Sequence, residues 1–228
     1  MLGLIEAFLK ADILDGLKAW TPEGGAPQGA VISPLLSNLY LNDLDHLMAR
    51  QGYEMTRYAD DLVIQCESRE QAERALATVQ AWTTKRGLTL HPTKTKIVDA
   101  VTDGFDFLGY RFVKHQRYPR KKSLAKFREV IRGKTPRTSG HSMNATIADV
   151  NRTTKGWFEF FKHSHRNVFP AVDGWIRMRL RSILRKRAGL RGRGRGADHQ
   201  RWPNAYFAKL GLYSLQTAYA KACQSSRR

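Results

Sequence analysis

Tyr58-Ala59-Asp60-Asp61 is the stretch around which the rest of this chain is organised. It lies between Met55-Thr56-Arg57 and Leu62-Val63-Ile64-Gln65-Cys66, two short runs rich in residues that favour strands. Two acids between such runs indicate the turn of a β-hairpin. Aspartate is common in turns because it bonds the local backbone. Adjacent carboxylates can equally hold Mg²⁺, which takes oxygen ligands. The motif alone leaves both interpretations open.

The distribution of charge is the second strong feature. Residues 1–110 contain 10 Lys and Arg against 15 Asp and Glu, whereas residues 111–228 contain 29 against 5. The whole chain carries a formal net charge of +19. A strongly basic half indicates a polyanion partner, most simply nucleic acid. The alternative is a basic surface that binds nothing.

Composition excludes several classes of protein. The chain has 228 residues, of which 42% are hydrophobic, so it can form a real core, and it contains no run of 18 or more apolar residues. We expect no membrane span and, from the acids among the first twenty residues, no signal peptide. Cys66 and Cys223 are too far apart for paired metal ligands, which favours free thiols in a cytoplasmic protein.

Turn chemistry and helical spacing predict the elements around the hairpin. A short helix is expected over 2–10, and a glycine loop over 24–30 leads to a helix that Ser33 caps, with Pro34 at its first position. Ser68 and Gln71 form a capping box for the next helix. That helix ends at Gly87, and an extended segment at 97–98 and a hairpin within 105–112 follow. This order predicts an α+β domain with an antiparallel sheet.

The basic half is predicted to be helical. Apolar spacing indicates helices over 124–132 and 147–161, separated by a linker from Gly133 to Gly140. A further helix has its apolar face at Ile176, Leu180, Ile183 and Leu184. On its flank Arg177, Arg181 and Arg185 lie four residues apart, so they can reach successive phosphates of one RNA strand.

The last segments offer further contacts for nucleic acid. The glycine-rich run 190–196 contains Arg191, Arg193 and Arg195 and is suited to backbone contacts without base recognition. Trp202 and the aromatic residues soon after it can stack on bases, or they can belong to a helical core.

Four sequence blocks, in the order in which they occur, resemble the C-terminal two-thirds of a group II intron reverse transcriptase/maturase. The blocks that carry the resemblance are Pro27-Gln28-Gly29 with Ile32-Ser33-Pro34-Leu35-Leu36, then Tyr58-Ala59-Asp60-Asp61, then Gly87-Leu88 leading to Lys94-Thr95, and Phe107-Leu108-Gly109-Tyr110. Each block is weak alone, and their shared order and spacing are strong. Ile147–Phe161 and Arg201–Phe207 resemble the maturase domain of that family.

The resemblance implies a fold and a division of the chain. The fold is α+β: a partial right-hand polymerase palm with an antiparallel sheet, followed by an α-helical thumb and maturase domain. The palm is expected over residues 1–117, the thumb start and a linker over 118–140, and the RNA-binding maturase domain over 141–228.

The resemblance also implies roles for individual residues. Asp60 and Asp61 would be catalytic and would hold Mg²⁺. Lys94 would protonate the leaving pyrophosphate, unless it only faces solvent. The nucleotide and template site would include Pro27, Gln28, Gly29, Tyr58 and Ala59. Phe107, Leu108, Gly109 and Tyr110 would grip the primer, unless their aromatic rings are core.

The implied function is that of a group II intron-encoded RNA-directed DNA polymerase and maturase. Such a protein binds intron RNA, assists splicing and reverse transcribes during intron mobility, so its partners would be intron RNA, template–primer and dNTPs. The family has a further palm aspartate and fingers upstream of the blocks seen here, and Asp12 does not take that place. The alternative is therefore an RNA-binding splicing cofactor without polymerase activity, or a polymerase completed by a separate N-terminal fingers/palm piece. We expect little DNA synthesis from this chain alone.

Overall fold

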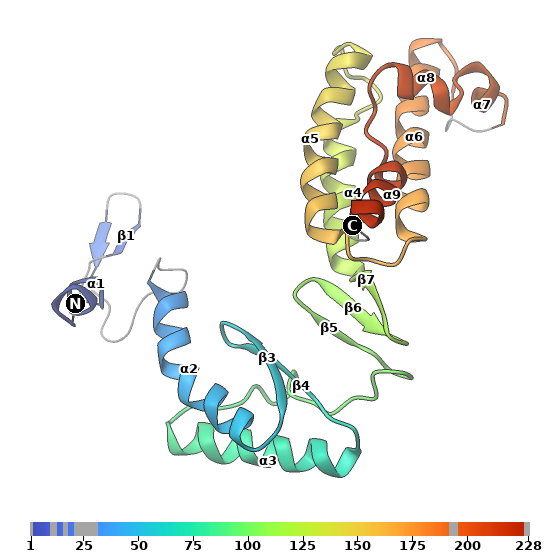
Figure 1. Cartoon of the computed structure of the whole chain (residues 1–228). Coiled ribbons are helices and arrows are strands. Elements are labelled where there is room, and N and C mark those ends of the chain that lie inside the picture. The colour runs from blue at the N-terminus through green and yellow to red at the C-terminus, as the bar shows by residue number, and fades with distance from the viewer. Residues whose placement is uncertain (1, 10–12, 16–17, 21–31, 192–195, 226–228) are drawn as a thin grey trace. The chain divides into compact units, whose positions relative to one another are not determined.

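The structure is a computed structural model that describes residues 2–9, 13–15, 18–20, 32–191 and 196–225 (Figure 1). The chain divides into two compact units, Met1–Ile97 and Val98–Arg228. Within the described residues, no helix combines the length and the apolar character needed to cross a membrane. The three-part division at residues 117 and 140 stays a prediction, and the two units are described below one at a time.

The first unit contains three helices and two hairpins within the described residues. Its helices are α1 (Leu2–Leu9), α2 (Ser33–Arg50) and α3 (Arg69–Lys85). The strands are β1 (Ile13–Asp15) with β2 (Lys18–Trp20), and β3 (Glu54–Tyr58) with β4 (Asp61–Gln65). Both pairs are antiparallel. The expected α+β class with antiparallel pairing is confirmed, but the β1–β2 pair was not predicted.

Helices α2 and α3 form the core of this unit with one face of the β3–β4 hairpin. Leu44 and Met48 of α2 meet Ala75 and Val79 of α3, and hairpin residues including Met55 pack against them. The first half of α2 is different, because Leu35 and Leu39 are 62% and 68% exposed. The predicted core helix is therefore buried only in its second half.

The ends of these helices test the capping predictions. The Ser68 hydroxyl accepts a hydrogen bond from the Gln71 amide at 3.2 Å, as the capping box requires. Gly87 ends α3 with a φ of 71°, a conformation that glycine adopts readily. The cap expected from Ser33 is wrong, because Ile32 is the N-cap and Ser33 is already helical. The strand expected at 97–98 is also absent, since residues 88–98 have no regular structure.

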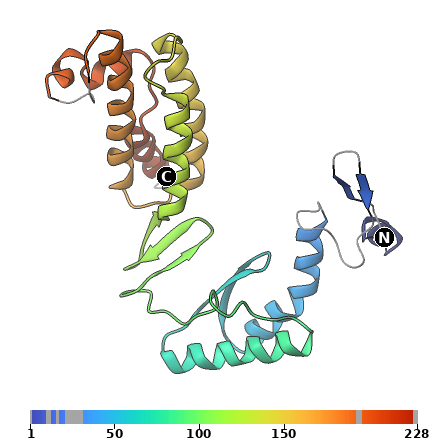
Figure 2. The ribbon, with the colours of Figure 1, turned by 180° about the vertical axis from the view of Figure 1, so that it is seen from behind.

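The second unit joins a small sheet to a helical bundle. Strands β5 (Phe105–Phe107), β6 (Tyr110–Val113) and β7 (Gln116–Pro119) form an antiparallel sheet in the order β5-β6-β7. The helices are α4 (Lys121–Lys134), α5 (Met143–Phe161), α6 (Val168–Arg187), α7 (Asp198–Arg201), α8 (Asn204–Lys209) and α9 (Leu215–Ser225). Figure 2 shows α4, α5 and α6 side by side. Their apolar faces, with Phe207 and Leu215, form one core.

The β5–β6 turn is attached to the bundle. Gly109 in this turn has a φ of 82°, and an added Cβ would lie 3.5 Å from the Phe160 ring of α5. The Gly109 carbonyl accepts hydrogen bonds from the Arg120 amide at 2.9 Å and from the Ser123 hydroxyl at 3.2 Å. The Tyr110 hydroxyl donates to the Phe160 carbonyl. The predicted hairpin is confirmed, and the β7 strand was missed.

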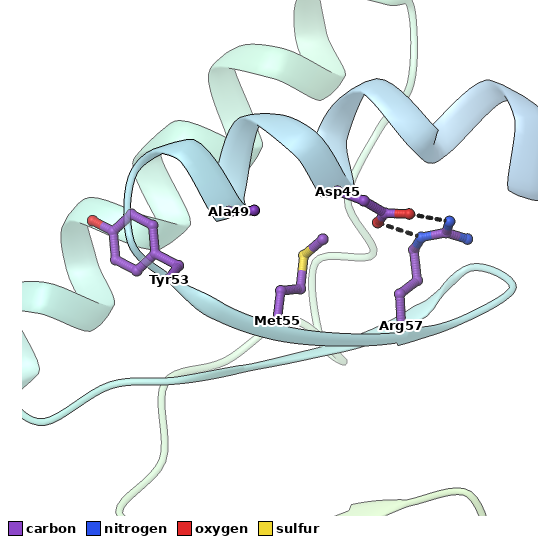
Figure 3. Close-up of a pocket in the computed structure, with 5 residues that line it drawn as sticks. All are labelled: Asp45, Ala49, Tyr53, Met55 and Arg57. Carbon is purple, nitrogen blue, oxygen red and sulfur yellow. Dashed lines mark hydrogen bonds and ion pairs between the residues drawn. The ribbon is translucent and has the colours of Figure 1, made fainter.

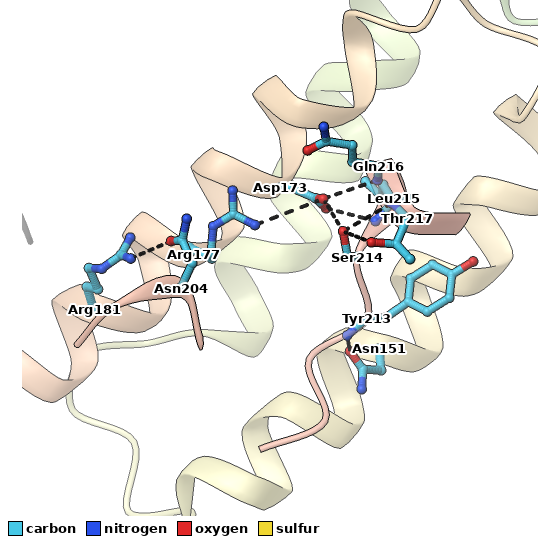
Figure 4. A network of polar contacts seen from close by, with 10 residues as sticks. All are labelled: Asn151, Asp173, Arg177, Arg181, Asn204, Tyr213, Ser214, Leu215, Gln216 and Thr217. Carbon is cyan, nitrogen blue, oxygen red and sulfur yellow. Dashed lines mark hydrogen bonds and ion pairs between the residues drawn. The ribbon is translucent and has the colours of Figure 1, made fainter. Parts of the chain in front are cut away.

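A buried carboxylate holds the C-terminal helix in place (Figure 4). Asp173 of α6 accepts hydrogen bonds from the backbone amides of Leu215 and Gln216 at 3.0 and 3.2 Å, and from the Ser214 hydroxyl at 2.9 Å. A carboxylate at a helix N-terminus satisfies free amides and complements the helix dipole. Asp173 therefore caps α9 from a different helix.

Candidate functional site

The two adjacent acids lie at a tight hairpin turn. Tyr58 pairs with Asp61 across β3 and β4, so Ala59 and Asp60 form a two-residue turn. Ala59 has a φ of 54°, in the left-handed region that residues with a Cβ rarely adopt. Strained backbone of this kind costs roughly 1–2 kcal/mol and persists only where surrounding contacts hold it.

Arg57 provides those contacts, and Figure 3 shows its ion pair with Asp45. Its Nη1 donates to the Ala59 carbonyl at 2.8 Å and to Asn38 Oδ1 at 3.1 Å, and its Nε donates to Asp45 Oδ1 at 2.8 Å. A second guanidinium nitrogen bonds the other Asp45 oxygen, so the ion pair is bidentate. The hydrogen bond and charge of Asp45 raise the pKa of Arg57 against the effect of burial. One side chain thus ties the strained turn to α2.

The neighbours of this ion pair leave a small hollow. Asp45, Ala49, Tyr53, Met55 and Arg57 line a cavity of about 300 Å³ beside α2 (Figure 3). Its polar groups are the members of the ion pair and the Tyr53 hydroxyl. Since the carboxylate and guanidinium already satisfy each other, this hollow has little free bonding capacity for a ligand.

The opposite face of the hairpin is open. Side chains alternate along a strand, so Tyr58 lies on the face opposite Arg57, and Asp61 is its cross-strand partner. The Tyr58 side chain is 66% exposed, and both Asp60 and Asp61 are exposed. Neither of these carboxylates has an ion pair or hydrogen bond with any residue that the structure describes. The two acids are therefore available for an external partner.

Asp60 also borders a larger hollow. A cavity of about 640 Å³ is lined by Asp60, by residues of the first half of α2 and by the end of α3. Its lining residues are Leu36, Ser37, Leu39, Tyr40, Leu41, Asp43, Asp60, Arg86 and Leu88. Arg86 there bonds Asp43 at 2.6 Å and lies over the Trp82 ring at 5.0 Å. Asp60 thus contributes to this mostly apolar hollow an acid that has no partner in the described part of the chain.

The remaining expected site residues of this unit are Pro27, Gln28, Gly29 and Lys94. Pro27, Gln28 and Gly29 lie outside the described residues. Lys94 is exposed in the irregular segment after α3 and lines neither hollow. Among the described residues, no group of three or more His, Cys, Asp or Glu side chains could hold a metal ion. The structure therefore offers two acids at the turn, and the roles of Lys94 and the glycine loop stay predictions.

The expected primer-grip block lies in the second unit. Phe107 ends β5, Leu108 and Gly109 form the turn, and Tyr110 begins β6. The Tyr110 ring stacks near Phe160 and Phe161, whereas Leu108 is partly exposed. The aromatic residue Tyr110 thus has a packing role, and contact with a primer stays a prediction for this block.

The arginine row on α6 differs from the expectation. Arg181 is only 2% exposed, and its guanidinium donates to the Trp202 carbonyl at 2.9 Å and to Asn204 Oδ1 at 2.7 Å. Burial lowers its pKa, and the nearby Arg177 adds to this effect. The expectation of three guanidiniums on one free flank is wrong at Arg181, because the segment before α8 covers that part of α6 (Figure 4).

The neighbours of Arg181 also have protein partners. Arg185 bonds Asp198 at 2.8 Å and the Arg191 carbonyl at 2.6 Å, and Arg177 lies 4.0 Å from Asp173. Arg193 and Arg195 lie outside the described residues. Trp202 is half-buried against the core, with Arg201 over its ring at 4.8 Å. RNA binding by these residues stays a prediction.

Sequence reasoning missed two groups of residues that the structure brings together. The Arg57–Asp45 pair could have been found from the alternation of side chains along β3. This alternation puts Arg57 on the covered face of the strand, where a cation requires a partner. The second group is Trp175 with Arg128 and Arg132, whose guanidiniums each lie 5.8 Å from its ring centre. The spacing of the two arginines, four residues apart, was the available signal.

Comparison with known proteins identifies two families along the chain. Residues 4–112 match the family described as reverse transcriptase (RNA-dependent DNA polymerase). Residues 124–202 match the maturase-specific domain of group II introns. The two matches lie in the order that the sequence motifs predicted, and together they cover most of the chain. This chain belongs to the group II intron reverse transcriptase/maturase family.

Individual relatives agree with this family. The group II intron-encoded protein LtrA of Lactococcus lactis subsp. cremoris is 35% identical over 28% of this chain and 10% of its own length. An uncharacterized 91 kDa protein in the cob intron of Schizosaccharomyces pombe is 27% identical over 37% of this chain and 18% of its own length. The chain thus spans less than a fifth of the length of each of these two relatives.

The family match and the compact units divide the chain differently. The reverse transcriptase match extends to Phe112 in β6, whereas the second compact unit begins at Val98. The β5–β6 hairpin therefore belongs to the polymerase part by sequence and to the maturase bundle by packing.

Proposed function

We propose that this chain acts as the palm and maturase portion of an RNA-directed DNA polymerase encoded by a group II intron. In this function it binds intron RNA, assists splicing and takes part in reverse transcription with template–primer and dNTPs. The observation that carries the proposal is the pair of acids Asp60 and Asp61, which have no partner among the described residues and lie at a braced turn inside the reverse transcriptase match. We place this activity in the cytoplasm.

The turn fits a divalent metal. Mg²⁺ is commonly held by one or two carboxylates together with substrate phosphates, which is the donor set that Asp60 and Asp61 supply. When bound, such metals activate the attacking hydroxyl and stabilise the leaving pyrophosphate. In this mechanism Arg57 keeps the turn in its strained conformation, and the exposed Tyr58 ring supports the primer end on the same face as Asp61. Lys94 is the proposed proton donor to the pyrophosphate.

The first test measures metal binding by the chain itself. Mn²⁺ replaces Mg²⁺ as a paramagnetic probe, and free Mn²⁺ is followed by electron paramagnetic resonance during titration. Asp60→Asn should remove the binding, because one of the two carboxylates is lost. The matched control is Asp43→Asn, which removes an exposed acid that already pairs with Arg86. Equal binding by Asp60→Asn and wild type contradicts the metal site.

The second test measures DNA synthesis. The chain is supplied with a fingers and palm polypeptide of the same family, and extension of a DNA primer on an RNA template is recorded. Asp60→Asn should lower the rate by about a thousandfold, since metal stabilisation of the transition state is worth several kcal/mol. Asp43→Asn should keep the wild-type rate. Extension that does not depend on Asp60 contradicts the proposed polymerase.

A further inference from the structure

Arginines on α4 and α6 gather around one tryptophan in the second unit. Trp175 of α6 is half-buried, and Arg128 and Arg132 of α4 both lie over its ring at 5.8 Å. Arg179 follows one helical turn after Trp175, and its charge interacts with those of Arg132 and Arg137. We name these five residues, Arg128, Arg132, Arg137, Trp175 and Arg179, the Trp175 patch.

The patch concentrates positive charge without a protein anion. From Arg111 onward the chain has five acids, and four of them lie in ion pairs with cations outside the patch. These four acids are Asp149, Glu159, Asp173 and Asp198. The fifth, Glu129, forms no ion pair with any residue that the structure describes. Within the described residues of this unit, no carboxylate therefore forms an ion pair with the patch.

Like charges in the patch oppose one another. Burial lowers the pKa of Arg179, and the guanidiniums of Arg137 and Arg132 lower it further. Arg179 is fixed there, because it donates to the Thr135 carbonyl at 2.6 Å and to the Thr135 hydroxyl at 3.1 Å. A bound anion would relieve this repulsion, and the described acids of this unit do not pair with the patch.

The geometry suits phosphate. A guanidinium that lies over an indole ring is held by cation–π attraction, and its N–H groups remain free for an outside acceptor. Arginine matches phosphate oxygens with two parallel hydrogen bonds. Several arginines on one face can meet successive phosphates of one strand, and arginines four residues apart lie on the same face of a helix.

We propose that the Trp175 patch binds the phosphate backbone of RNA. The proposal rests on the proposed function, because intron RNA is the polyanion that a maturase domain meets, and the whole patch lies within the maturase match. RNA is favoured over a lipid surface because the patch has one apolar side chain, Trp175, which is half-buried between guanidiniums and not available for insertion.

The test compares two charge-matched double variants of the full chain. Arg128→Gln with Arg132→Gln removes two charges from the patch. Arg152→Gln with Arg166→Gln removes two charges from exposed arginines elsewhere in the same unit. The probe is a fluorescent RNA hairpin of unrelated sequence, and fluorescence anisotropy measures its Kd from low to physiological salt. Circular dichroism checks that all variants are folded.

Loss of both patch arginines should raise the Kd for the RNA hairpin by roughly tenfold or more. The control variant should raise it by much less. The slope of log K against log salt should fall by roughly 1.5 for two lost phosphate contacts. A Trp175→Phe variant keeps the charges and the packing but offers a smaller ring, so it should weaken binding only a few-fold.

Three results overturn the proposal. Equal losses in both double variants mean that binding follows net charge and not this patch. An unchanged affinity of the patch variant means that the patch does not contact RNA. A loss of binding to vesicles that contain phosphatidylglycerol, with RNA binding intact, assigns the patch to membranes.

The proposed polymerase is tested separately in this experiment. The dependence of DNA synthesis on Asp60, which lies in the other unit, is measured beside the affinity of the patch variant for the RNA hairpin. If the patch result holds while DNA synthesis does not depend on Asp60, the patch stands and the polymerase function fails. If DNA synthesis requires Asp60 and the patch variant binds RNA normally, the polymerase function stands and the patch proposal fails.

Discussion

The two units of this chain differ in the sign of the charged residues that have no described partner at the proposed sites. In residues 1–97, the arginines Arg57 and Arg86 are paired with acids of α2, while the acids Asp60 and Asp61 have no described partner. In residues 98–228, four acids of the bundle are paired, while Arg128 and Arg132 have no described anionic partner. The charges left without a described partner at the proposed sites are therefore negative in the first unit and positive in the second.

This difference separates charges that maintain the fold from charges that serve a partner. A paired, buried charge should cost much stability when it is removed, because its partner is left unsatisfied. An exposed charge without a partner should cost almost none. Residue type and net charge do not distinguish the two groups, but their contacts do.

The largest expected effect on stability concerns Arg181 of α6. Arg181→Met removes the buried guanidinium and leaves the Trp202 carbonyl and Asn204 without their donor. We expect the free energy of unfolding to fall by about 3 kcal/mol. Native-state hydrogen exchange of the α6 and α8 amides measures this locally. Arg128→Met is the matched control and should cost less than about 0.5 kcal/mol.

If the two variants were equally stable, Arg181 would not differ from a surface cation, and the row Arg177, Arg181 and Arg185 could again be considered a free RNA-binding flank. A charge reversal at all three positions does not answer this question. It would disrupt the packing at Arg181 together with any contact to RNA, so unfolding and lost binding could not be told apart.

The hairpin offers the second comparison. Arg57→Ala removes the contacts to Asp45, Asn38 and the Ala59 carbonyl, and should lower the stability of the β3–β4 hairpin by about 2 kcal/mol. Hydrogen exchange of the strand amides records the change. Arg57→Lys should recover part of it, since an ammonium cannot form the bidentate pair.

Asp60→Asn provides the contrast, with an expected change within about 0.5 kcal/mol. The two acids at the turn would then serve a partner and not the fold. A destabilisation as large as that of Arg57→Ala would instead make Asp60 a structural turn residue, which is the simpler interpretation that its sequence also allowed.

Much of the local structure could be predicted from sequence because it depends on nearby residues. Helical spacing identified α3, α5 and α6, and the two acids between strand-like runs identified the β3–β4 turn. The turn at Gly109 could be recognised as well, since glycine adopts positive φ freely and both residues of that turn have it.

The features that the sequence did not predict depend mostly on contacts with distant segments. Arg181 lies next to the apolar stripe of α6, and only the fold of residues 202–204, more than twenty positions away, turns it into a buried residue. The exposure of Leu35 and Leu39 is a similar case, because periodicity shows that a face is apolar but not whether any element covers it. Strands β1, β2 and β7 were missed because such short segments have little periodic signal.

The smallest expected effect concerns an acid of the basic unit that already has a partner. Lys134 at the end of α4 donates to Asp149 of α5 at 3.0 Å and holds the pKa of that carboxyl below its ordinary value, with further help from Arg152 and His141. A carboxyl whose folded pKa is lowered stabilises the fold above its unfolded pKa, near pH 4, and this contribution disappears as pH falls through the folded pKa.

Lys134→Met should therefore lower the Tm at pH 7, and the difference from wild type should shrink as pH falls below about 4 and vanish once the Asp149 carboxyl is protonated. Thermal unfolding followed by circular dichroism at several pH values measures this. Lys155→Met is the control, because Lys155 lies over the Tyr213 ring at 5.8 Å and has no acid partner within the described residues. Its effect on Tm should not change over the same range of pH. If the Lys134→Met difference persisted in acid strong enough to protonate Asp149, the contribution of Lys134 would come from the packing of its stem and not from its charge. Asp149 would then not belong with the paired charges of the bundle.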